Sequence, residues 1–182
     1  MNVATYPEQS QRAFADAATH ERMREFLDRE SELIDARHYR PWLDLVSEDF
    51  SYRMPVPVTP DNPEAPHFNA ESLIIDETRE TLTEHWFRRF EPDMWEIAWG
   101  EVPPVRLRHF VTNVRVRVIE DGLYDVRSNA LVTATRQSDQ SNVLAVERFD
   151  VIEGGDEAVR LRSRFVVAET TVIEFATLRV VL

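Results

Sequence analysis

The clearest structural signal in this chain is the alternating segment RLRHFVTNVRVRV at residues 106–118. Its mainly apolar face changes parity in the middle, with Leu107, His109 and Val111 on one parity and Val114, Val116 and Val118 on the other. Because successive side chains of a strand point to opposite faces, a change of parity requires one extra residue. We therefore predict a long strand with a β-bulge near Thr112 and Asn113, which would bend the sheet.

The chain after residue 118 keeps the two-residue period. Glu120-Asp121-Gly122 predicts a hairpin turn, and the alternation of Tyr124, Val126 and Ala130 with polar residues predicts a half-buried strand after it. Three further strands are expected, over residues 143–152, 159–167 and 172–182.

The chain before residue 106 predicts mainly helices. Residues 9–36 contain no Gly or Pro and carry apolar side chains at helical spacing, namely Met23, Phe26, Leu27, Leu33 and Ile34. A short helix is expected from Pro41, and another over residues 70–90. Residues 50–56 predict a strand that ends in a loop rich in proline.

Helices followed by an antiparallel meander indicate the α+β class, with the N-terminal helices packed on one face of a strongly bent, mostly antiparallel sheet. Such a sheet would enclose a cone-shaped cavity. We expect a single domain over residues 1–182, in which residues 1–20 form an N-terminal arm or a helix extension.

The composition excludes several kinds of chemistry. The 182 residues include 33 Asp and Glu against 21 basic residues, all of them Arg, so the formal net charge is −12. Without Lys or Cys, no lysine Schiff base, thiolate nucleophile, disulfide or cysteine-ligated metal site can form. The acidic charge argues against a nucleic-acid partner. With no signal peptide or membrane span in the sequence, we expect a cytoplasmic protein.

Two polar residues stand on apolar faces. Glu30 lies on the apolar stripe of the first helix, so it is either an acid/base group in the cone or, more simply, a buried polar anchor. His109 shares the parity of Leu107 and could form a proton-abstracting dyad with Asp44 or Glu30, or be a hydrogen-bonded core histidine. The five histidines show no spacing typical of a metal site.

Arginines alternate along two of the predicted strands. Arg160, Arg162 and Arg164 would form a ladder on one face, which Arg115 and Arg117 extend. The ladder is either a solvated sheet face or a docking surface, since guanidinium groups bind carboxylates through two parallel hydrogen bonds.

Several segments resemble the small (β) subunit of aromatic-ring-hydroxylating, Rieske-type dioxygenases. They are RESELID at residues 29–35, Tyr39 with WLDL at 42–45, EDFSYRMP at 48–55, His67-Phe68, and the most specific one, AWGEVPPVRLRHFVTNV at 98–114. Arg127-Ser128-Asn129 and Glu147-Arg148 also fall where that family has similar residues. The likeness extends over nearly the whole chain from about Glu21.

The resemblance implies a fold, a partner and a role. The fold would be a cone-shaped barrel of the nuclear-transport-factor-2-like, cystatin-like type. The partner would be a large α subunit that carries a Rieske 2Fe-2S cluster and a mononuclear iron, with electrons from NAD(P)H delivered through a reductase. The two subunits would assemble as α3β3 and convert an arene to a cis-dihydrodiol. This chain would then hold no catalytic, cofactor or metal site, and its subunit contacts are expected at the five ladder arginines and at Trp99, Arg106 and Arg108.

Two alternatives remain open at this stage. One is a stand-alone dehydratase or isomerase that uses His109 with Asp44 or Glu30, since similar barrels host catalysis. The other is a binding protein for a small ligand. An open pocket into which these side chains converge would favour the first alternative.

Overall fold

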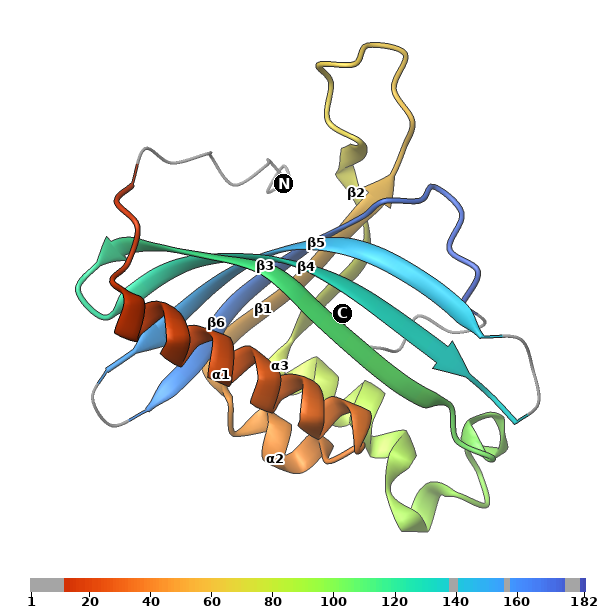
Figure 1. Ribbon diagram of the computed structural model, residues 1–182. Helices are drawn as coiled ribbons and strands as arrows, with labels where there is room; N and C mark the ends of the chain where they lie inside the picture. The colour runs from red at the N-terminus through yellow and green to blue at the C-terminus, as the bar shows by residue number, and fades with distance from the viewer. Residues whose placement is uncertain (1–11, 138–140, 156–157, 176–180) are drawn as a thin grey trace.

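A computed structural model describes residues 12–137, 141–155, 158–175 and 181–182. The helical part comprises α1 (Ala17–Asp35), α2 (Tyr39–Leu43), the single turn α3 (Arg79–Thr81), a π-helical turn (Leu82–Trp86) and three 3-10 turns (Phe87–Phe90, Pro92–Met94 and Trp99–Glu101). The strands are β1 (Val46–Pro57), β2 (Phe68–Thr78), β3 (Arg106–Glu120), β4 (Leu123–Thr135), β5 (Asn142–Gly154) and β6 (Val159–Ala168). The helices all lie on one side of the sheet (Figure 1).

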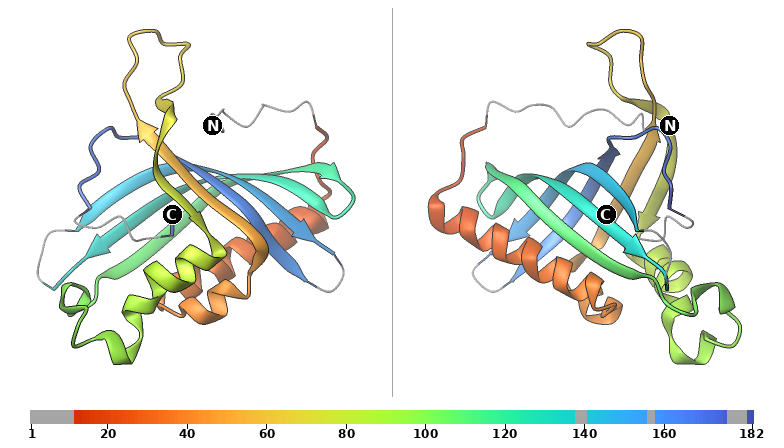
Figure 2. Two further views of the ribbon diagram at one scale, coloured as in Figure 1. Left: turned by 180° about the vertical axis from the view of Figure 1, so that it is seen from behind. Right: turned by 45° about the vertical axis from the view of Figure 1, so that its right-hand side comes forward.

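The six strands form one bent sheet in the order β2-β1-β6-β5-β4-β3. Only the β1–β6 pair is parallel, and β2 and β3 are the two edges, so the sheet stays open rather than closing into a barrel. Figure 2 shows how the sheet curves around the helices. The α+β class and the bent, mostly antiparallel sheet predicted from the sequence are therefore confirmed.

The β-bulge in β3 lies where the parity change predicted it. The pairing of β3 with β4 shifts register between Thr112 and Arg115, and Asn113 has a positive φ of 54°. After the bulge Val116 is buried, as Leu107 is before it, so both halves of the strand turn their apolar side toward α1. The hairpin turn at Gly122 is also confirmed, with a φ of 74°.

A substitution at Asn113 tests the role of the bulge. Asn tolerates the left-handed region, whereas a β-branched side chain does not, so Asn113→Val is expected to lower the free energy of unfolding by about 1–2 kcal/mol. Asn113→Gly, which removes the side chain but suits this φ, is the control and should cost no more than a few tenths of a kcal/mol. Urea unfolding measures both, and equal midpoints for the two variants would contradict the prediction.

Helix α1 follows the predicted apolar stripe and begins at Ala17. Asp16 caps its N-terminus by accepting a hydrogen bond from the Thr19 N–H at 2.7 Å, and this bond lowers the pKa of Asp16. The chain before the cap is extended, since Phe14 forms an isolated bridge with Arg117 on the edge strand β3. Residues 12–16 thus protect part of an otherwise open sheet edge.

Two predicted elements are wrong. Residues 70–78, expected to be helical, belong to strand β2, because pairing with β1 outweighs an apolar spacing that also suits a helix. The helical turns begin only at Arg79, where Thr78 and Thr81 form a capping box. The final strand predicted over 172–182 is absent from residues 172–175 and 181–182, and the rest of it lies outside the described residues.

The core lies between the inner sheet face and the helices, and a smaller apolar cluster of Phe68, Phe149, Phe165 and Val167 lies on the outer face. The proline-rich loop between β1 and β2 projects from the body of the molecule (Figure 1), as a surface loop should. No helix in the described part of the chain is long and apolar enough to span a membrane.

Candidate functional sites

Four buried charged side chains meet on the inner face of the sheet. Glu30 of α1 lies opposite Arg148 and Asp150 of β5 and Arg164 of β6, and we call these four residues the ion quartet. Arg164 binds Glu30 through two hydrogen bonds of 2.7 and 2.8 Å and Asp150 through two of 2.8 and 2.9 Å. Arg148 donates to Glu30 at 2.5 Å and lies 3.7 Å from Asp150. Two cations and two anions therefore compensate each other.

The ion quartet is tied to three other parts of the fold. The indole N–H of Trp42 in α2 donates to Glu30 at 3.2 Å. A main-chain oxygen of Leu182 accepts from Arg164 at 3.3 Å, while the Leu182 N–H donates to the Tyr52 hydroxyl at 3.0 Å. Burial raises the pKa of Asp150 and of Tyr52, because desolvation disfavours their charged forms. On the inner face of the sheet, where a cone-shaped cavity was expected, these buried side chains bind one another.

The sequence located only part of this network. Glu30 is 2 % exposed and is a buried anchor. Arg164 was placed wrongly on the same face as Arg160 and Arg162: a bulge at Arg162, which the β5–β6 pairing skips, turns Arg164 inward. Arg148 and Asp150 were missed, although they share the parity of Leu144, Val146 and Ile152, and that shared parity was the available signal.

His109 pairs with a carboxylate that the sequence did not single out. Its Nδ1 lies 2.7 Å from Oδ1 of Asp35, and its Nε2 lies 2.9 Å from the Val181 carbonyl oxygen. The Asp35 carboxylate also accepts the His109 main-chain N–H at 3.2 Å. Both ring nitrogens therefore face oxygen acceptors within the fold. The side chain is 3 % exposed, so the pair is sealed in the fold.

The dyad considered for a stand-alone enzyme is therefore not assembled. Glu30 is bound within the ion quartet, and Asp44, the residue after α2, is exposed to solvent. His109 uses Asp35 instead, because the end of α1 lies against the first half of β3.

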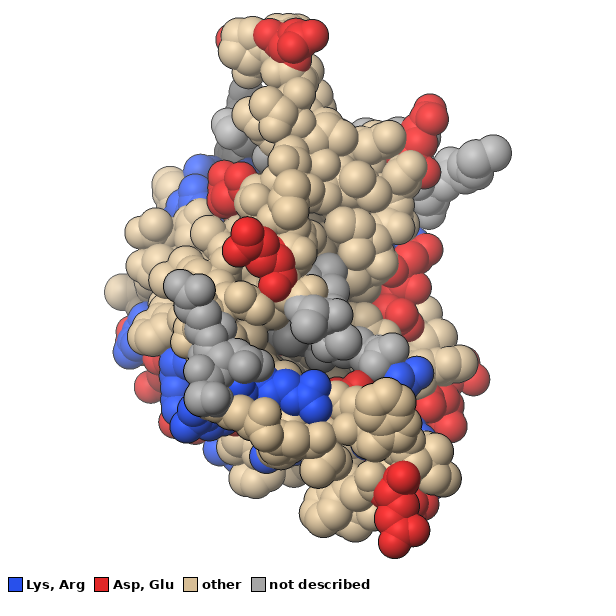
Figure 3. All heavy atoms as spheres, turned by 90° about the vertical axis from the view of Figure 1, so that its right-hand side faces the viewer, with Lys and Arg blue, Asp and Glu red and all other residues tan. Residues whose placement is uncertain are grey.

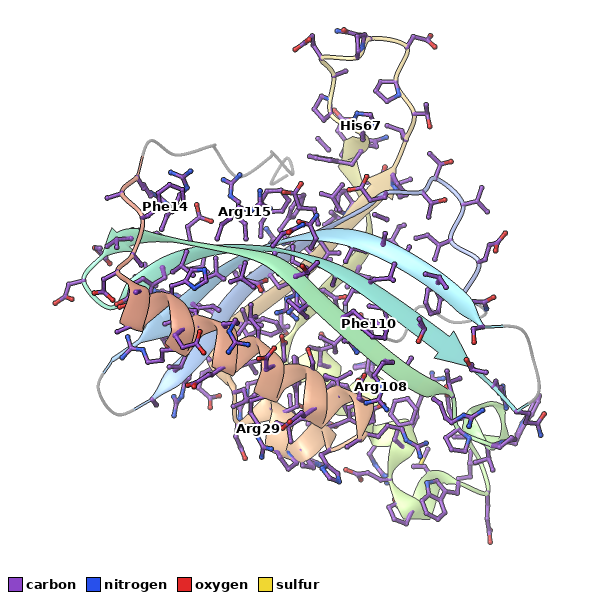
Figure 4. The ribbon with its side chains drawn as sticks, in the orientation of Figure 1. Phe14, Arg29, His67, Arg108, Phe110 and Arg115 are labelled. Carbon is purple, nitrogen blue, oxygen red and sulfur yellow. The ribbon has the colours of Figure 1, made fainter. Side chains whose placement is uncertain are left out.

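The outer face of the sheet carries an exposed apolar group. Phe110, Leu131 and Val143 are 54 %, 41 % and 55 % exposed, and we call them the outer patch. Phe110 is directly paired with Leu131. Val143 is paired with Thr133, two residues along β4 from Leu131 and therefore on the same face, so the three lie close together on β3, β4 and β5. Figure 4 shows Phe110 between Arg108 and Arg115 along β3.

The remaining ladder arginines are on the surface with local partners. Arg162 lies 3.2 Å from Asp49 and Arg115 lies 3.4 Å from Glu147. Arg117 lies over the Phe14 ring at 4.2 Å, and Arg160 is exposed. They do not form one continuous ladder, since β3 and β6 are separated by β4 and β5 in the sheet.

A second exposed apolar group occupies the irregular chain before β3. Trp95, Ile97, Trp99 and Val102 are 56 %, 69 %, 80 % and 46 % exposed, and we call residues 92–104 the tryptophan segment. Beside it is a cleft of about 370 Å³, lined by Ala36, Arg37, Arg89, Phe90, Trp95, Glu101, Val102 and Pro104. Arg106 and Arg108, exposed at the start of β3, follow directly in the chain.

Arg37 reaches this cleft from a conformation that side chains rarely adopt. It follows α1 with a φ of 57°, in a helix-ending motif in which the His38 N–H donates to the Leu33 carbonyl and the Arg37 N–H to that of Ile34. Glycine is the usual residue at this position, and an L-residue there costs about 1 kcal/mol. Such strain at a cleft is a reason to examine the residue for function.

The sequence lacks the ligands that a Rieske cluster requires. A Rieske cluster requires two Cys and two His ligands, and the chain contains no Cys. Among the described residues, no three His, Asp or Glu side chains are grouped so as to hold a metal ion. A Rieske cluster therefore does not fit this chain.

Comparisons with solved structures show the same fold. Naphthalene 1,2-dioxygenase with indole bound in its active site matches with a TM-score of 0.78 and 24 % identity, over 92 % of this chain and 88 % of that one. The benzoate 1,2-dioxygenase β subunit of Burkholderia mallei matches with a TM-score of 0.61 and 22 % identity, over 86 % and 93 %. A scytalone dehydratase-like protein of Novosphingobium aromaticivorans matches with a TM-score of 0.61 and 14 % identity, over 88 % and 90 %.

Fold similarity alone does not separate dioxygenase subunits from dehydratases, since both kinds of protein share this architecture. The family comparison does separate them. A family model described as "Ring hydroxylating beta subunit" matches residues 29–175, which is most of the chain. This protein therefore belongs to the family of ring-hydroxylating dioxygenase β subunits, the small subunits of a class of oxidoreductases.

Proposed function

We propose that this chain is a non-catalytic β subunit that scaffolds an α3β3 oxygenase, and that the oxygenase cis-dihydroxylates an aromatic compound in its catabolism. The observation that carries the proposal is the ion quartet. In a catalytic protein of this fold the interior acid and base groups would have to be free to meet a substrate, whereas here Glu30, Arg164 and their partners bind one another. The sealed pairing of His109 with Asp35 supports the same role.

The redox centres of the proposed oxygenase belong to its large subunit. A Rieske 2Fe-2S cluster and a mononuclear iron are expected there, with electrons from NAD(P)H delivered through a reductase. The absence of Cys from this chain supports this division of labour, because thiolates are needed to ligate the cluster. NAD(P)H as the electron source also suits our proposal of a cytoplasmic assembly.

Reconstitution tests the proposed function. The chain is purified alone and together with the candidate large subunit, which is identified by a Rieske motif in a neighbouring coding sequence. With reductase, NAD(P)H and a panel of arenes, the complex is expected to form a cis-dihydrodiol, and the isolated chain should neither turn over nor bind iron. Stoichiometric iron or turnover in the isolated chain would contradict a non-catalytic role, and a complex without product would contradict the oxygenase assignment.

The outer patch is the contact that we propose for the trimer of this chain. Phe110, Leu131 and Val143 form an apolar surface without a helix over it, and exposed apolar groups of this kind mark protein contacts. Charged and polar side chains surround it, among them Arg115 and Glu147, as at the rim of a typical interface.

Phe110→Asp is expected to dissociate the trimer to monomers at micromolar concentrations, because it places a charge in the apolar centre of the contact. Sedimentation velocity measures the mass. Ile74→Asp is the matched control, since Ile74 is 42 % exposed on the opposite edge strand β2 and its substitution should leave the trimer intact. A monomeric wild type would contradict the trimer, and a trimeric Phe110→Asp variant would contradict the assignment of the patch.

A further inference from the structure

The tryptophan segment and the cleft beside it form a surface that no contact within the described chain explains. Trp99 is 80 % exposed, and Trp95 and Ile97 also have more than half of their surface exposed. An exposed group of large apolar side chains on a single protein marks an interaction site, and Trp and Arg are the residue types that most often dominate binding energy. Here both types meet, because Trp95 lines the cleft together with Arg37 and Arg89.

Two acids near this surface are paired with arginines and a third, Glu96, is exposed between Trp95 and Ile97, whereas two arginines in the cleft have no ion-pair partner among the described residues. Glu91 is paired with Arg40 and Arg88, and Asp93 is paired with Arg88. In the described part of the chain, neither Arg37 nor Arg89 has a carboxylate within ion-pair distance, and Arg89 donates only to the His85 carbonyl. Glu101 is the single acidic residue that lines the cleft. The cleft is therefore open to further negative charge.

The arginines extend beyond the cleft on the same side of the molecule. Arg136 donates to the Val102 carbonyl at 3.0 Å, which places its guanidinium against the tryptophan segment. A second cleft of about 230 Å³ shares Arg37 and Phe90 with the first, so Arg37 lies between two hollows. Figure 3 shows arginines gathered at mid-height on this side beside largely uncharged surface, with acidic side chains above them, along the right-hand edge and at the lower end.

We propose that the tryptophan segment and its cleft are the docking surface for the large subunit, and that they bind an acidic segment of it with an apolar side chain inserted into the cleft. The inference rests on the proposed function and adds to it the location and chemistry of the contact. Charge complementarity supports this occupant: the chain has a net charge of −12, so an acidic segment is repelled by most of the molecule but attracted here.

Two other occupants fit less well. A small ligand would use the cleft alone and leave Trp99, outside its lining, without a role. A second copy of this chain related by a two-fold axis would bring Arg37 and Arg89 against the same arginines, and like charges oppose association. The backbone conformation of Arg37 agrees with a binding role. Glycine would adopt this φ without strain, yet the chain has an arginine here, which places a guanidinium beside the cleft.

Binding of the separately purified large subunit to trimeric β subunits tests the proposal. Trp99→Ala is expected to raise the Kd at least about tenfold, and Arg37→Gly with Arg89→Ala by a similar factor that shrinks as salt is added. Arg37→Gly relieves the backbone conformation, and Trp99 is exposed, so both variants should fold and remain trimeric. Ile74→Ala and Arg53→Ala on β2 and β1 are the matched controls, which should leave the Kd unchanged.

The outcomes separate the inference from the function on which it rests. If the wild type binds the large subunit and all variants bind equally, this docking surface is wrong while the proposed function stands. If the wild type fails to bind a large subunit at all, both are wrong. Variants that lose the trimer but bind the large subunit normally would show that a second copy occupies the surface, and this would overturn the inference.

Discussion

Replacing Glu30 with alanine is expected to lower the free energy of unfolding by about 3–5 kcal/mol, since removing one member of a buried ion pair leaves its partners charged and uncompensated. Glu30 accepts three hydrogen bonds from Arg148 and Arg164 and one from Trp42. Without it, Arg164 keeps Asp150, but Arg148 keeps only a carboxylate 3.7 Å away. Urea unfolding followed by tryptophan fluorescence measures the loss.

Glu32→Ala is the control for this prediction. Glu32 lies on the same helix, its side chain is 72 % exposed, and its contact with Arg29 is 3.5 Å long, so its loss should cost less than about 1 kcal/mol. Glu30→Gln keeps an acceptor for Trp42 but removes the charge, and an intermediate loss is expected. If Glu30→Ala were as stable as Glu32→Ala, the ion quartet would contribute little to the stability of the fold.

Replacing Asp35 with alanine is expected to have the second largest effect, a loss of about 2–3 kcal/mol. Its carboxylate accepts from both the ring and the main-chain N–H of His109, and a buried donor that loses its partner carries the full cost of desolvation. The Val181 carbonyl on the other side of the ring would lose its fixed orientation toward His109. The variant is therefore expected to loosen the contact between α1, β3 and the buried residues 181–182.

Arg108→Ala is the matched control for the Asp35 variant. Arg108 contacts the same carboxylate at 3.3 Å, but its side chain is 66 % exposed, so its removal should cost less than about 1 kcal/mol. The two variants are compared by chemical unfolding under identical conditions. Equal losses would indicate that the surface ion pair, rather than the buried histidine, accounts for the role of Asp35.

Much of the fold could be read from local patterns. The parity change of β3, the apolar stripe of α1 and the turn at Gly122 are encoded by neighbours in the chain, so counting positions was enough to locate them. Strand β2 could not be read in this way. Its apolar residues also suit a helix, and only pairing with β1 decides between the two states.

The residues of the candidate sites were harder to predict from the sequence than the fold. Arg164 was predicted on the wrong face of the sheet because a single bulged residue, Arg162, reverses the parity of the residues after it. No local apolar pattern indicates that bulge. The partner of His109 was missed because Asp35 is 74 residues away in the chain. Of the tryptophan segment, only Trp99 was predicted from the sequence as a subunit contact. The exposure of Trp95 and Ile97 depends on which residues pack around them, and the sequence does not show this.

The amino-acid sequence by itself determined the α+β class, the bend in β3, and the exclusion of cysteine-ligated redox centres, because composition and periodicity depend only on which residues follow one another. The tertiary structure decided which charges compensate each other. Glu30 meets Arg148 and Arg164 from 118 and 134 residues away, and Arg37 and Arg89 come to share one cleft. Such contacts depend on how the helices pack over the bent sheet, because they join residues that are far apart in the chain.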